Sequence, residues 1–228
     1  TIPLDQIGPW LRRNRVMDAS ELNNSAYIVA QDERALISGP GDRVFARGPF
    51  PDGERTYGIY RVGEHYVDPV TSEYLGYQVI DIGTTKLLSS NRDDVTEHEV
   101  TRITEEVRMG DRLLPYEERV LDATFHPQAP EQDIEGIMIG VDGGLDQIAQ
   151  FSIVTIKRGK RDGLQIGHVL AVYQVGRNVF DKVWETNVRL PYTRAGLAMV
   201  FDSYEKVSYA IVLKTTRPIK VMDVVKNP

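Results

Sequence analysis

The sequence predicts an all-β protein of two tandem, related modules, each a small β-barrel or sandwich, behind a short and partly helical N-terminal arm at residues 1–26. Three observations lead to this fold class. Short runs of β-branched and aromatic residues recur from residue 27 to the C-terminus. Clusters of Gly, Pro, Asn and Asp separate these runs and are typical of the tight turns in barrels and sandwiches. The first half of the chain also matches the second at a nearly constant spacing.

The arm is expected to contain no strand. Apolar residues recur at helical spacing between residues 4 and 11, where a Gly-Pro pair interrupts them. A second short helix is expected after Asp18, because an Asp side chain can accept a hydrogen bond from the first turn of a helix.

The predicted strands are short and evenly spaced. In the first half they cover residues 27–31, 43–47, 57–61, 65–68, 74–83 and 96–103. In the second half they cover residues 136–141, 147–157, 168–175, 179–184, 197–201, 207–214 and 221–225. Residues 122–133 contain two prolines and no periodicity, so they are the predicted linker between modules at residues 27–121 and 134–228.

The clearest pattern is residues 153–173, which predict a strand, a glycine-rich turn and a second strand. Glycine adopts positive φ without strain, and Asp hydrogen-bonds to its own backbone in turns. Four residues are predicted to define this turn: Gly159, Asp162, Gly163 and Gly167.

The internal match indicates a duplication. Residues 96–111 match residues 208–223 at a constant offset of 112, and this offset hardly changes in the other matching segments. Two copies are fewer than a solenoid needs. The sequence therefore predicts two domains with the same strand order.

Composition excludes several classes of protein. The 228 residues carry a net charge of −6, with 14 basic against 21 acidic residues in 1–121 and 13 against 12 in 122–228, which argues against a nucleic-acid partner. The chain has no cysteine, so disulfides and thiolate chemistry are excluded. No apolar run is long enough for a membrane span, and no cofactor-binding motif is present.

Candidate catalytic and metal-binding residues have simpler interpretations. Asp42, Asp111 and Asp223 each stand at the entry to a strand, which favours a role in turns over catalysis. The four histidines lack the spacing of a zinc site, and residues 142–146 lack the full calcium-loop pattern and are predicted to form a hairpin. A carboxylate pair of the kind that glycosidases use stays open, because 33 acidic residues always permit some pair.

The densest basic cluster interrupts the two predicted strands of residues 153–173. It consists of Lys157, Arg158, Lys160 and Arg161. Two interpretations stay open: a solvated hairpin tip, and an electrostatic contact with an acidic partner.

A series of short segments, in order along nearly the whole chain, resembles one known family. They are TIPLD (1–5), YIVA (27–30), GDRV (41–44), YGIY (57–60), LGY (75–77), GDRLLP (110–115), RGKRDGL (158–164), GHVLAVY (167–173), RAGL (194–197), EKVSYA (205–210) and TRP (216–218). These segments resemble the C-terminal region of LysM-containing type IV pilus secretin-associated proteins of Gram-negative bacteria. That region is similar to the C-terminal domain of a flagellar outer-membrane H-ring protein.

The resemblance implies a non-enzymatic adaptor in the periplasm, associated with the outer membrane and cell wall. Its partners would be the pilus secretin and, through a LysM domain expected before Thr1, peptidoglycan. The resemblance implies neither cofactors nor catalytic residues. The alternatives are a glycan- or peptidoglycan-binding module and a carboxylate-dependent cell-wall hydrolase, which would need an exposed aromatic platform and a cleft with two acids, respectively.

Overall fold

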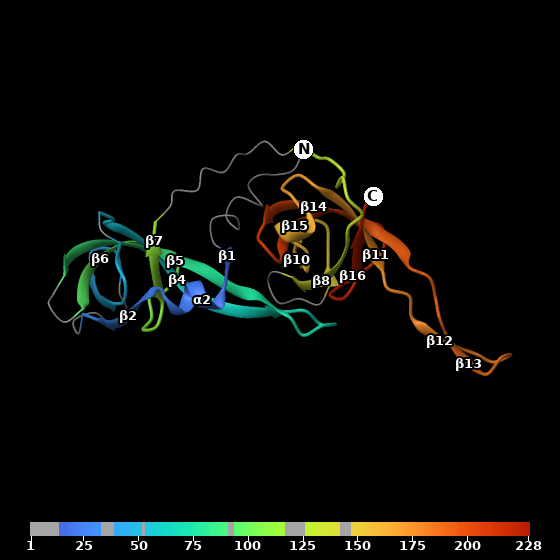
Figure 1. Ribbon diagram of the computed structural model, residues 1–228, viewed down its shortest axis with the longest axis horizontal. Coiled ribbons are helices and arrows are strands. Elements are labelled where there is room, and N and C mark those ends of the chain that lie inside the picture. The colour runs from blue at the N-terminus through green and yellow to red at the C-terminus, as the bar shows by residue number, and fades with distance from the viewer. Residues whose placement is uncertain (1–13, 33–38, 52, 91–93, 117–125, 142–146) are drawn as a thin grey trace. The chain divides into compact units, whose positions relative to one another are not determined.

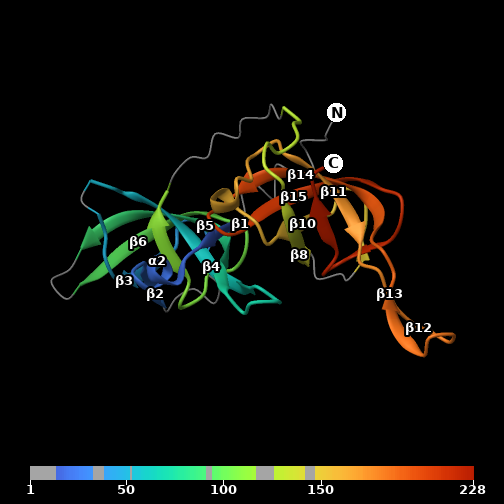
Figure 2. The same ribbon diagram turned by 45° about the vertical axis from the view of Figure 1, so that its right-hand side comes forward.

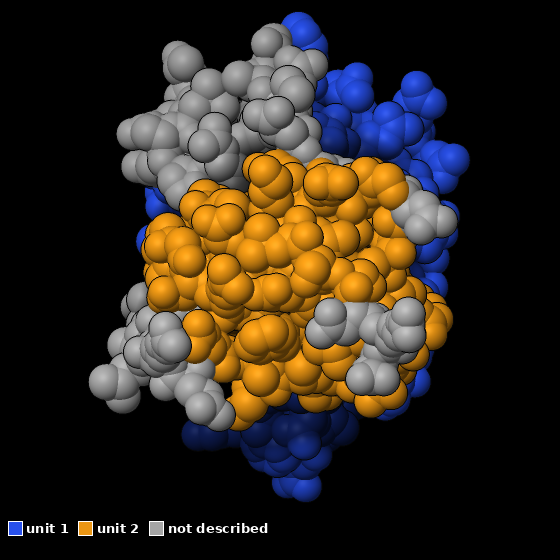
Figure 3. All heavy atoms as spheres, turned by 90° about the vertical axis from the view of Figure 1, so that its left-hand side faces the viewer, with its two compact units in different colours: residues 1–7, 67–75, 122–228 blue, residues 8–66, 76–121 orange. Residues whose placement is uncertain are grey.

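The computed structural model describes residues 14–228, apart from 33–38, 52, 91–93, 117–125 and 142–146 (Figure 1). It is almost entirely β, with 57% strand and 4% helix, so the predicted fold class is confirmed. The chain divides into two compact units, coloured in Figure 3: residues 8–66 with 76–121, and residues 1–7, 67–75 and 122–228. We call them the N-terminal module and the C-terminal module.

The N-terminal module is a seven-stranded sheet with one short helix. Its elements are β1 (Asn14–Met17), α2 (Ala19–Asn23), β2 (Ala26–Gln31), β3 (Arg43–Arg47), β4 (Thr56–Val67), β5 (Tyr74–Ser90), β6 (Val95–Ile103) and β7 (Arg112–Pro115). The strand order is β1-β5-β4-β7-β2-β3-β6, and β6 also pairs with β5. Six strands therefore form a closed ring, and β1 lies beside β5 outside it.

Four expectations for this module were wrong. Asn14–Met17 is a strand, because its backbone pairs antiparallel with β5 at Tyr77 to Ile80. The two strands predicted at 57–61 and 65–68 form the single strand β4, and β5 continues beyond its predicted end at Gly83 as far as Ser90. The helix after Asp18 is present, but the Asp18 side chain makes no capping hydrogen bond.

The C-terminal module is a closed six-stranded barrel with two small additional sheets. Its elements are β8 (Glu135–Val141), β9 (Gln147–Ile148), β10 (Ile153–Ile156), η1 (Lys160–Asp162), β11 (Val169–Gln174), β12 (Asn178–Asp181), β13 (Thr186–Arg189), β14 (Thr193–Ser203), β15 (Ser208–Thr215), β16 (Ile219–Lys220) and β17 (Val224–Lys226). The barrel order is β10-β15-β14-β11-β17-β8, while β9 pairs with β16 and β12 with β13.

Residues 153–173 do not form a hairpin. β10 lies between β15 and β8, and β11 lies between β14 and β17. The 3₁₀ helix η1 and a second turn occupy the connection, so each strand pairs with other strands of the barrel. The predicted strand 179–184 is also wrong at its end, because Lys182 begins a tight turn that leads into β13.

The strand order of the two modules agrees with the predicted duplication. Around the N-terminal ring the order is β5-β4-β7-β2-β3-β6, and around the barrel it is β14-β11-β17-β8-β10-β15. The two series correspond strand for strand. The sequence match of 96–111 with 208–223 also aligns β6 with β15, which hold the same place in the two rings.

Two pairs of turns carry the same hydrogen bonds in both modules. Gly41 N donates to Val100 O, and in the equivalent turn Phe151 N donates to Val212 O. Gly110 N likewise donates to Ile28 O, as Met222 N does to Met138 O. In all four turns the residue that donates has positive φ. The turns thus fasten equivalent strand ends in both modules.

Each module has its own apolar core. In the N-terminal module the buried residues include Ile28, Val44, Tyr57, Ile59, Ile82, Val100 and Leu113. In the C-terminal module they include Met138, Val154, Ile156, Leu164, Leu170, Val200 and Val212. Most lie on the inward positions of ring strands, where alternation brings every second side chain to the same face.

Candidate functional site: a docked hairpin, an exposed hairpin and a cleft

The predicted basic cluster lies in the C-terminal module, after β10, and two of its four residues pair with the β4–β5 hairpin tip. The Lys157 ammonium pairs with Asp68. The Arg161 guanidinium donates to both carboxylate oxygens of Glu73, at 2.6 and 2.8 Å. Val67–Leu75, the tip of the β4–β5 hairpin, belongs to the same compact unit as these cations.

A third cation completes this arrangement. Lys206 Nζ donates to Tyr74 O at 2.9 Å and lies 3.5 Å from Glu73 Oε1. Lys206 comes from the β14–β15 connection, whereas Lys157 and Arg161 come from the β10–β11 connection. The ends of two connections therefore form a basic docking face for an acidic hairpin tip, which we call the tip dock.

The tip dock lowers the pKa values of two carboxyl groups of the hairpin tip. Burial alone would raise the pKa of Asp68, but hydrogen bonds from Lys157 and Thr71 and from the backbone of Val70 lower it well below its usual range. Hydrogen bonds from Arg161 lower the pKa of Glu73 to about 2. Both side chains are thus held as anions by the cations that they face.

The other two predicted contact residues have different surroundings. Arg158 Nε lies 3.8 Å from Asp162 Oδ1. Lys160 is exposed, and within the described residues no carboxylate lies within ion-pair distance of its ammonium. Of the four cations, Lys160 is the one most open to an external acidic partner.

The four predicted turn residues close the connection after β10. Asp162 Oδ2 accepts from Gly159 N at 3.0 Å, and Gly163 has φ of 82°, in the left-handed region. Gly167 has φ of 91°, and a Cβ there would lie 2.6 Å from His126 O. The glycines are needed for backbone conformation and close approach, which leaves them no chemical role.

A second hairpin, β12–β13, stands apart from the barrel strands (Figures 1 and 2). Its strands pair with each other and, among the described residues, with no other strand. Val183 and Trp184 at its tip are 85% and 78% exposed, and Phe180 and Val188 are exposed along its length. Two-stranded ribbons are marginally stable alone, so an exposed ribbon with apolar side chains is typical of an interaction site.

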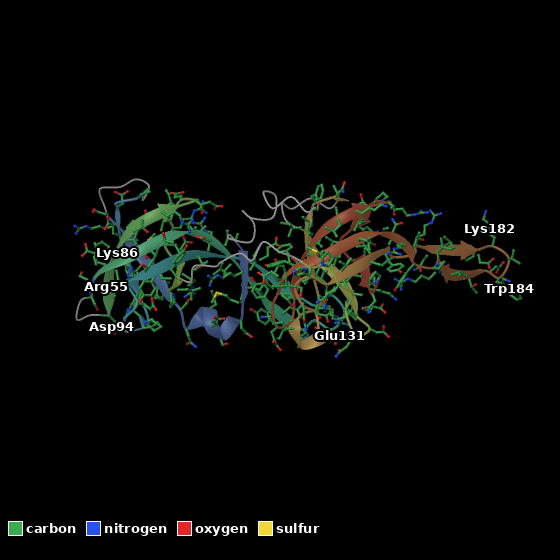
Figure 4. All side chains as sticks on the ribbon, turned by 90° about the horizontal axis from the view of Figure 1, so that it is seen from above. Arg55, Lys86, Asp94, Glu131, Lys182 and Trp184 are labelled. Carbon is green, nitrogen blue, oxygen red and sulfur yellow. The ribbon has the colours of Figure 1, made fainter. Side chains whose placement is uncertain are left out.

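The tip of this hairpin has a defined backbone conformation. Asp181 Oδ1 accepts from Val183 N at 2.8 Å and from Trp184 N at 3.3 Å. Glu185 has φ of 52°, which completes the turn. The indole of Trp184 is therefore presented from a preorganised loop, with Lys182 at the same end of the hairpin (Figure 4) and Glu185 next in sequence.

The N-terminal module contains a cleft of about 470 Å³. Its apolar wall is formed by Phe50, Pro51, Leu87 and Leu88, and its charged residues are Glu54, Arg55 and Asp94. The Phe50 ring packs against Tyr57 and His98 at centroid distances of 5.2 and 5.1 Å. Arg55 and Asp94 lie at the same end of the module in Figure 4.

His98 lies beneath the cleft in the core. Its Nε2 is 2.9 Å from Thr96 Oγ1, and its Nδ1 is 3.4 Å from Thr85 Oγ1. Burial lowers the pKa of His98 to about 4. No group of three or more potential metal ligands occurs in the part of the chain that the structure describes.

The remaining predicted residues have structural roles or lie outside the described residues. Asp111 accepts from Arg108 N and from Arg61, and Asp223 accepts from Lys220 N and Val175 N. Asp42 accepts from Gly39 N. The hairpin expected at 142–146 lies outside the described residues. In the linker predicted at 122–133, Pro130 and Gln132 accept from the Asn227 amide of the C-terminal module.

Comparison with known proteins adds no family assignment. No family model matches the chain, and no curated protein matches it either. Among the described residues, no helix is long and apolar enough to cross a membrane.

Trp184 was not predicted to be exposed, because it stands at the end of the predicted strand 179–184. The signal was Asp181, since an Asp that bonds to the backbone two residues later opens a turn.

Proposed function

We propose that the chain is a non-enzymatic periplasmic adaptor that associates with the type IV pilus outer-membrane secretin. In the complete protein, a LysM domain outside this chain would link it to peptidoglycan. The secretin, the cell-wall link and the location come from the family that the sequence resembles.

The observation that supports an adaptor is the β12–β13 hairpin. Trp and other aromatic side chains dominate the binding energy of many protein interfaces. A fixed loop also reduces the entropy that binding costs, because the tip is already ordered. The tip dock supports the same role, since in it a hairpin tip is recognised by side chains of a barrel.

Co-purification tests this function. The intact chain, immobilised through its C-terminus, should retain detergent-solubilised secretin from a purified preparation. Lys160→Glu should reduce retention several-fold if the exposed cation faces an acidic surface of the secretin, and 0.5 M NaCl should have a similar effect, because charged contacts at a rim are screened by salt at roughly 0.1 M and above.

Lys214→Glu is a matched control. Lys214 is also an exposed lysine of the C-terminal module, near the end of β15 opposite to the Ser208 end that adjoins Lys206. The Lys214→Glu variant should retain the secretin as well as the unmodified chain does. If the unmodified chain retains no secretin, the proposed function is wrong.

One observation favours the glycan-binding alternative, namely the exposed aromatic rings of Trp184 and Phe180, because aromatic rings stack on sugars. Sedimentation with purified peptidoglycan sacculi separates the two functions. For an adaptor without its LysM domain we expect the chain to stay in the supernatant. Co-sedimentation that Trp184→Ala abolishes would instead assign the hairpin to glycan binding.

A further inference from the structure

The β12–β13 hairpin and the β4–β5 hairpin are counterparts in the two modules. β4 and β5 correspond to β11 and β14, and each pair is joined by a chain excursion beyond the ring. The first excursion ends in Val67–Leu75, which is seated on the tip dock. The second ends in Val183 and Trp184, which are exposed.

The tip dock also has a counterpart, in the N-terminal module. Lys157 follows β10, and its N–H donates to Ile137 O of β8. Arg47 ends β3 and pairs with Tyr27 of β2. Because β3 and β2 hold the ring positions of β10 and β8, Lys157 corresponds to Arg47. Lys206 lies in the β14–β15 connection and corresponds to Asp94 in the β5–β6 connection, by the same alignment that matches 96–111 with 208–223. The counterpart of the tip dock is therefore the surface of the β3–β4 and β5–β6 connections.

These two connections line the cleft of about 470 Å³. The β3–β4 connection contributes Gly48, Phe50, Pro51, Gly53, Glu54 and Arg55. The end of β5, the β5–β6 connection and the start of β6 contribute Leu87, Leu88, Ser89, Ser90, Asp94 and Thr96. The surface that holds a hairpin tip in one module is thus a cleft in the other.

The docked tip and its dock are joined by charged side chains, whereas the exposed tip and the cleft both combine apolar with charged side chains. The docked tip presents Asp68 and Glu73 to cations. The exposed tip presents Val183 and Trp184 between one cation and one anion, and the cleft offers an apolar wall beside both Arg55 and two acids. The two surfaces are therefore complementary, because both have apolar side chains and each has charges opposite to those of the other.

From this equivalence we propose that the β12–β13 tip of one copy of this chain binds the cleft of a second copy. Trp184 packs against Phe50, Pro51 and Leu88, while Lys182 faces Glu54 or Asp94 and Glu185 faces Arg55. The two surfaces are different, so the contact is heterologous and each copy keeps one tip and one cleft for further copies. This contact between copies requires no secretin.

A small contact of this kind gives weak association. Interfaces below about 1,200 Å² are typical of transient complexes, so the test uses a wide range of concentrations. In sedimentation-velocity experiments on the chain alone, the average mass should rise with concentration above the monomer. Trp184→Ala should weaken association by at least about tenfold, because a buried aromatic anchor commonly contributes that much.

Mixing two defective variants gives the sharpest test. Trp184→Ala keeps its cleft, and Leu88→Asp keeps its tip, so each alone should be monomeric and the mixture should form one-to-one dimers. Met109→Ala, which alters an exposed apolar side chain outside both surfaces, should associate like the parent. Circular dichroism confirms that every variant is folded.

Fluorescence identifies what covers the tip. In a Trp10→Phe background, the emission of Trp184 should shift to the blue as protein concentration rises. Four results would overturn the proposal: a monomer at every concentration, association that Trp184→Ala leaves intact, defective variants that do not complement, and a blue-shifted monomer, which would mean that the tip is covered within its own chain. A shift that needs phospholipid vesicles would also overturn it and assign the tip to a membrane.

Discussion

The two modules have the same strand order and the same turn hydrogen bonds, yet different residues make the turns. Gly41 and Gly110 hold the positive-φ positions of the N-terminal module, and Phe151 and Met222 hold them in the C-terminal module. The acceptor that follows is Asp in three of the four turns and Ser152 in the other. The fold therefore requires a backbone conformation and a side-chain acceptor, which different residues supply.

The modules differ most in what extends beyond their rings. One hairpin tip is acidic and held by three cations, whereas the other is apolar and exposed. Ring strands are constrained by the core, while a hairpin beyond the ring is constrained only by what it contacts. Divergence of function after duplication is expected first in these hairpins.

The largest expected effect comes from removing the acceptors of equivalent turns. Asp111→Ala should destabilise the N-terminal module by about 3–5 kcal/mol, because Arg61 loses a buried carboxylate that it contacts at 3.1 and 3.0 Å. Asp223→Ala should cost about 2–3 kcal/mol, because two backbone N–H groups lose their acceptor but no cation does. Urea unfolding measures both.

A matched control is Glu105→Ala, which removes the more exposed carboxylate beside Arg61. An exposed ion pair contributes about 0–1 kcal/mol, so this variant should unfold nearly like the parent. If Asp111→Ala and Asp223→Ala lower the free energy of unfolding equally, the ion pair with Arg61 adds nothing to the turn hydrogen bonds.

Acid should destabilise the N-terminal module through His98. Its pKa in the folded state is about 4, below the ordinary value of 6.5, so between these two pH values the unfolded chain binds more protons than the folded chain. The stability that neutral His98 contributes is therefore fully present above pH 6.5 and is lost as the pH falls toward 4. Between pH 7 and pH 5 the loss should be about 2 kcal/mol.

Thermal melting at both pH values checks this, with His98→Gln as the variant that lacks the titration. Among the described residues, the polar side chains that contact His98 are Thr96 and Thr85, and Phe50 and Tyr57 pack on it, so burial is the cause of its lowered pKa. Burial lowers the pKa of His168 in the C-terminal module in the same direction. An unchanged melting difference between pH 7 and pH 5 in His98→Gln would show that other groups cause the acid loss.

The fold class and the duplication could be predicted because both depend on patterns that can be read directly along the sequence. Strand runs, turn residues and a constant offset need no knowledge of which strands pair. The pairing of β10 with β15 and β8 could not be predicted, since β15 lies far along the chain, beyond β11 and β14, and the pairing depends on closing the ring. β1 was missed for the same reason, because its hydrogen bonds come from β5.

The candidate site was harder to predict than the fold. Lys157 and Arg161 stand out as a cluster in sequence, but their carboxylate partners, Asp68 and Glu73, come from the first half of the chain. Only the folded chain shows that two of the four cations pair with these carboxylates and that a third, Arg158, lies beside Asp162. The cleft is likewise made by two connections that are adjacent only in the ring.

Gly163→Val should destabilise the C-terminal module by roughly 1–3 kcal/mol, because φ of 82° strains a β-branched residue. The nearest atom to an added Cβ is Oε1 of Gln132, at 3.2 Å, and this flexible side chain can move, so backbone strain is the main cost. Gly163→Asn, which tolerates the left-handed region, is the control and should lose much less in urea unfolding. Equal losses for Val and Asn would contradict strain as the cause.

The smallest expected effect exchanges the turn residues of the two modules. Gly110 and Met222 occupy equivalent turns at φ of 89° and 78°. Gly110→Met should destabilise by about 1 kcal/mol through left-handed strain, and an added Cβ there meets nothing within 4 Å, so no clash adds to it. Met222→Gly relieves the same strain, which stabilises the fold. It also raises the conformational entropy of the unfolded chain, which destabilises the fold by about 0.4–1 kcal/mol. The net effect should therefore lie between zero and a slight stabilisation. Because Met222 is 46% exposed, little core packing is lost. If Met222→Gly destabilises as much as Gly110→Met, packing of the methionine outweighs strain, and the two turns are equivalent in hydrogen bonding but not in energetics.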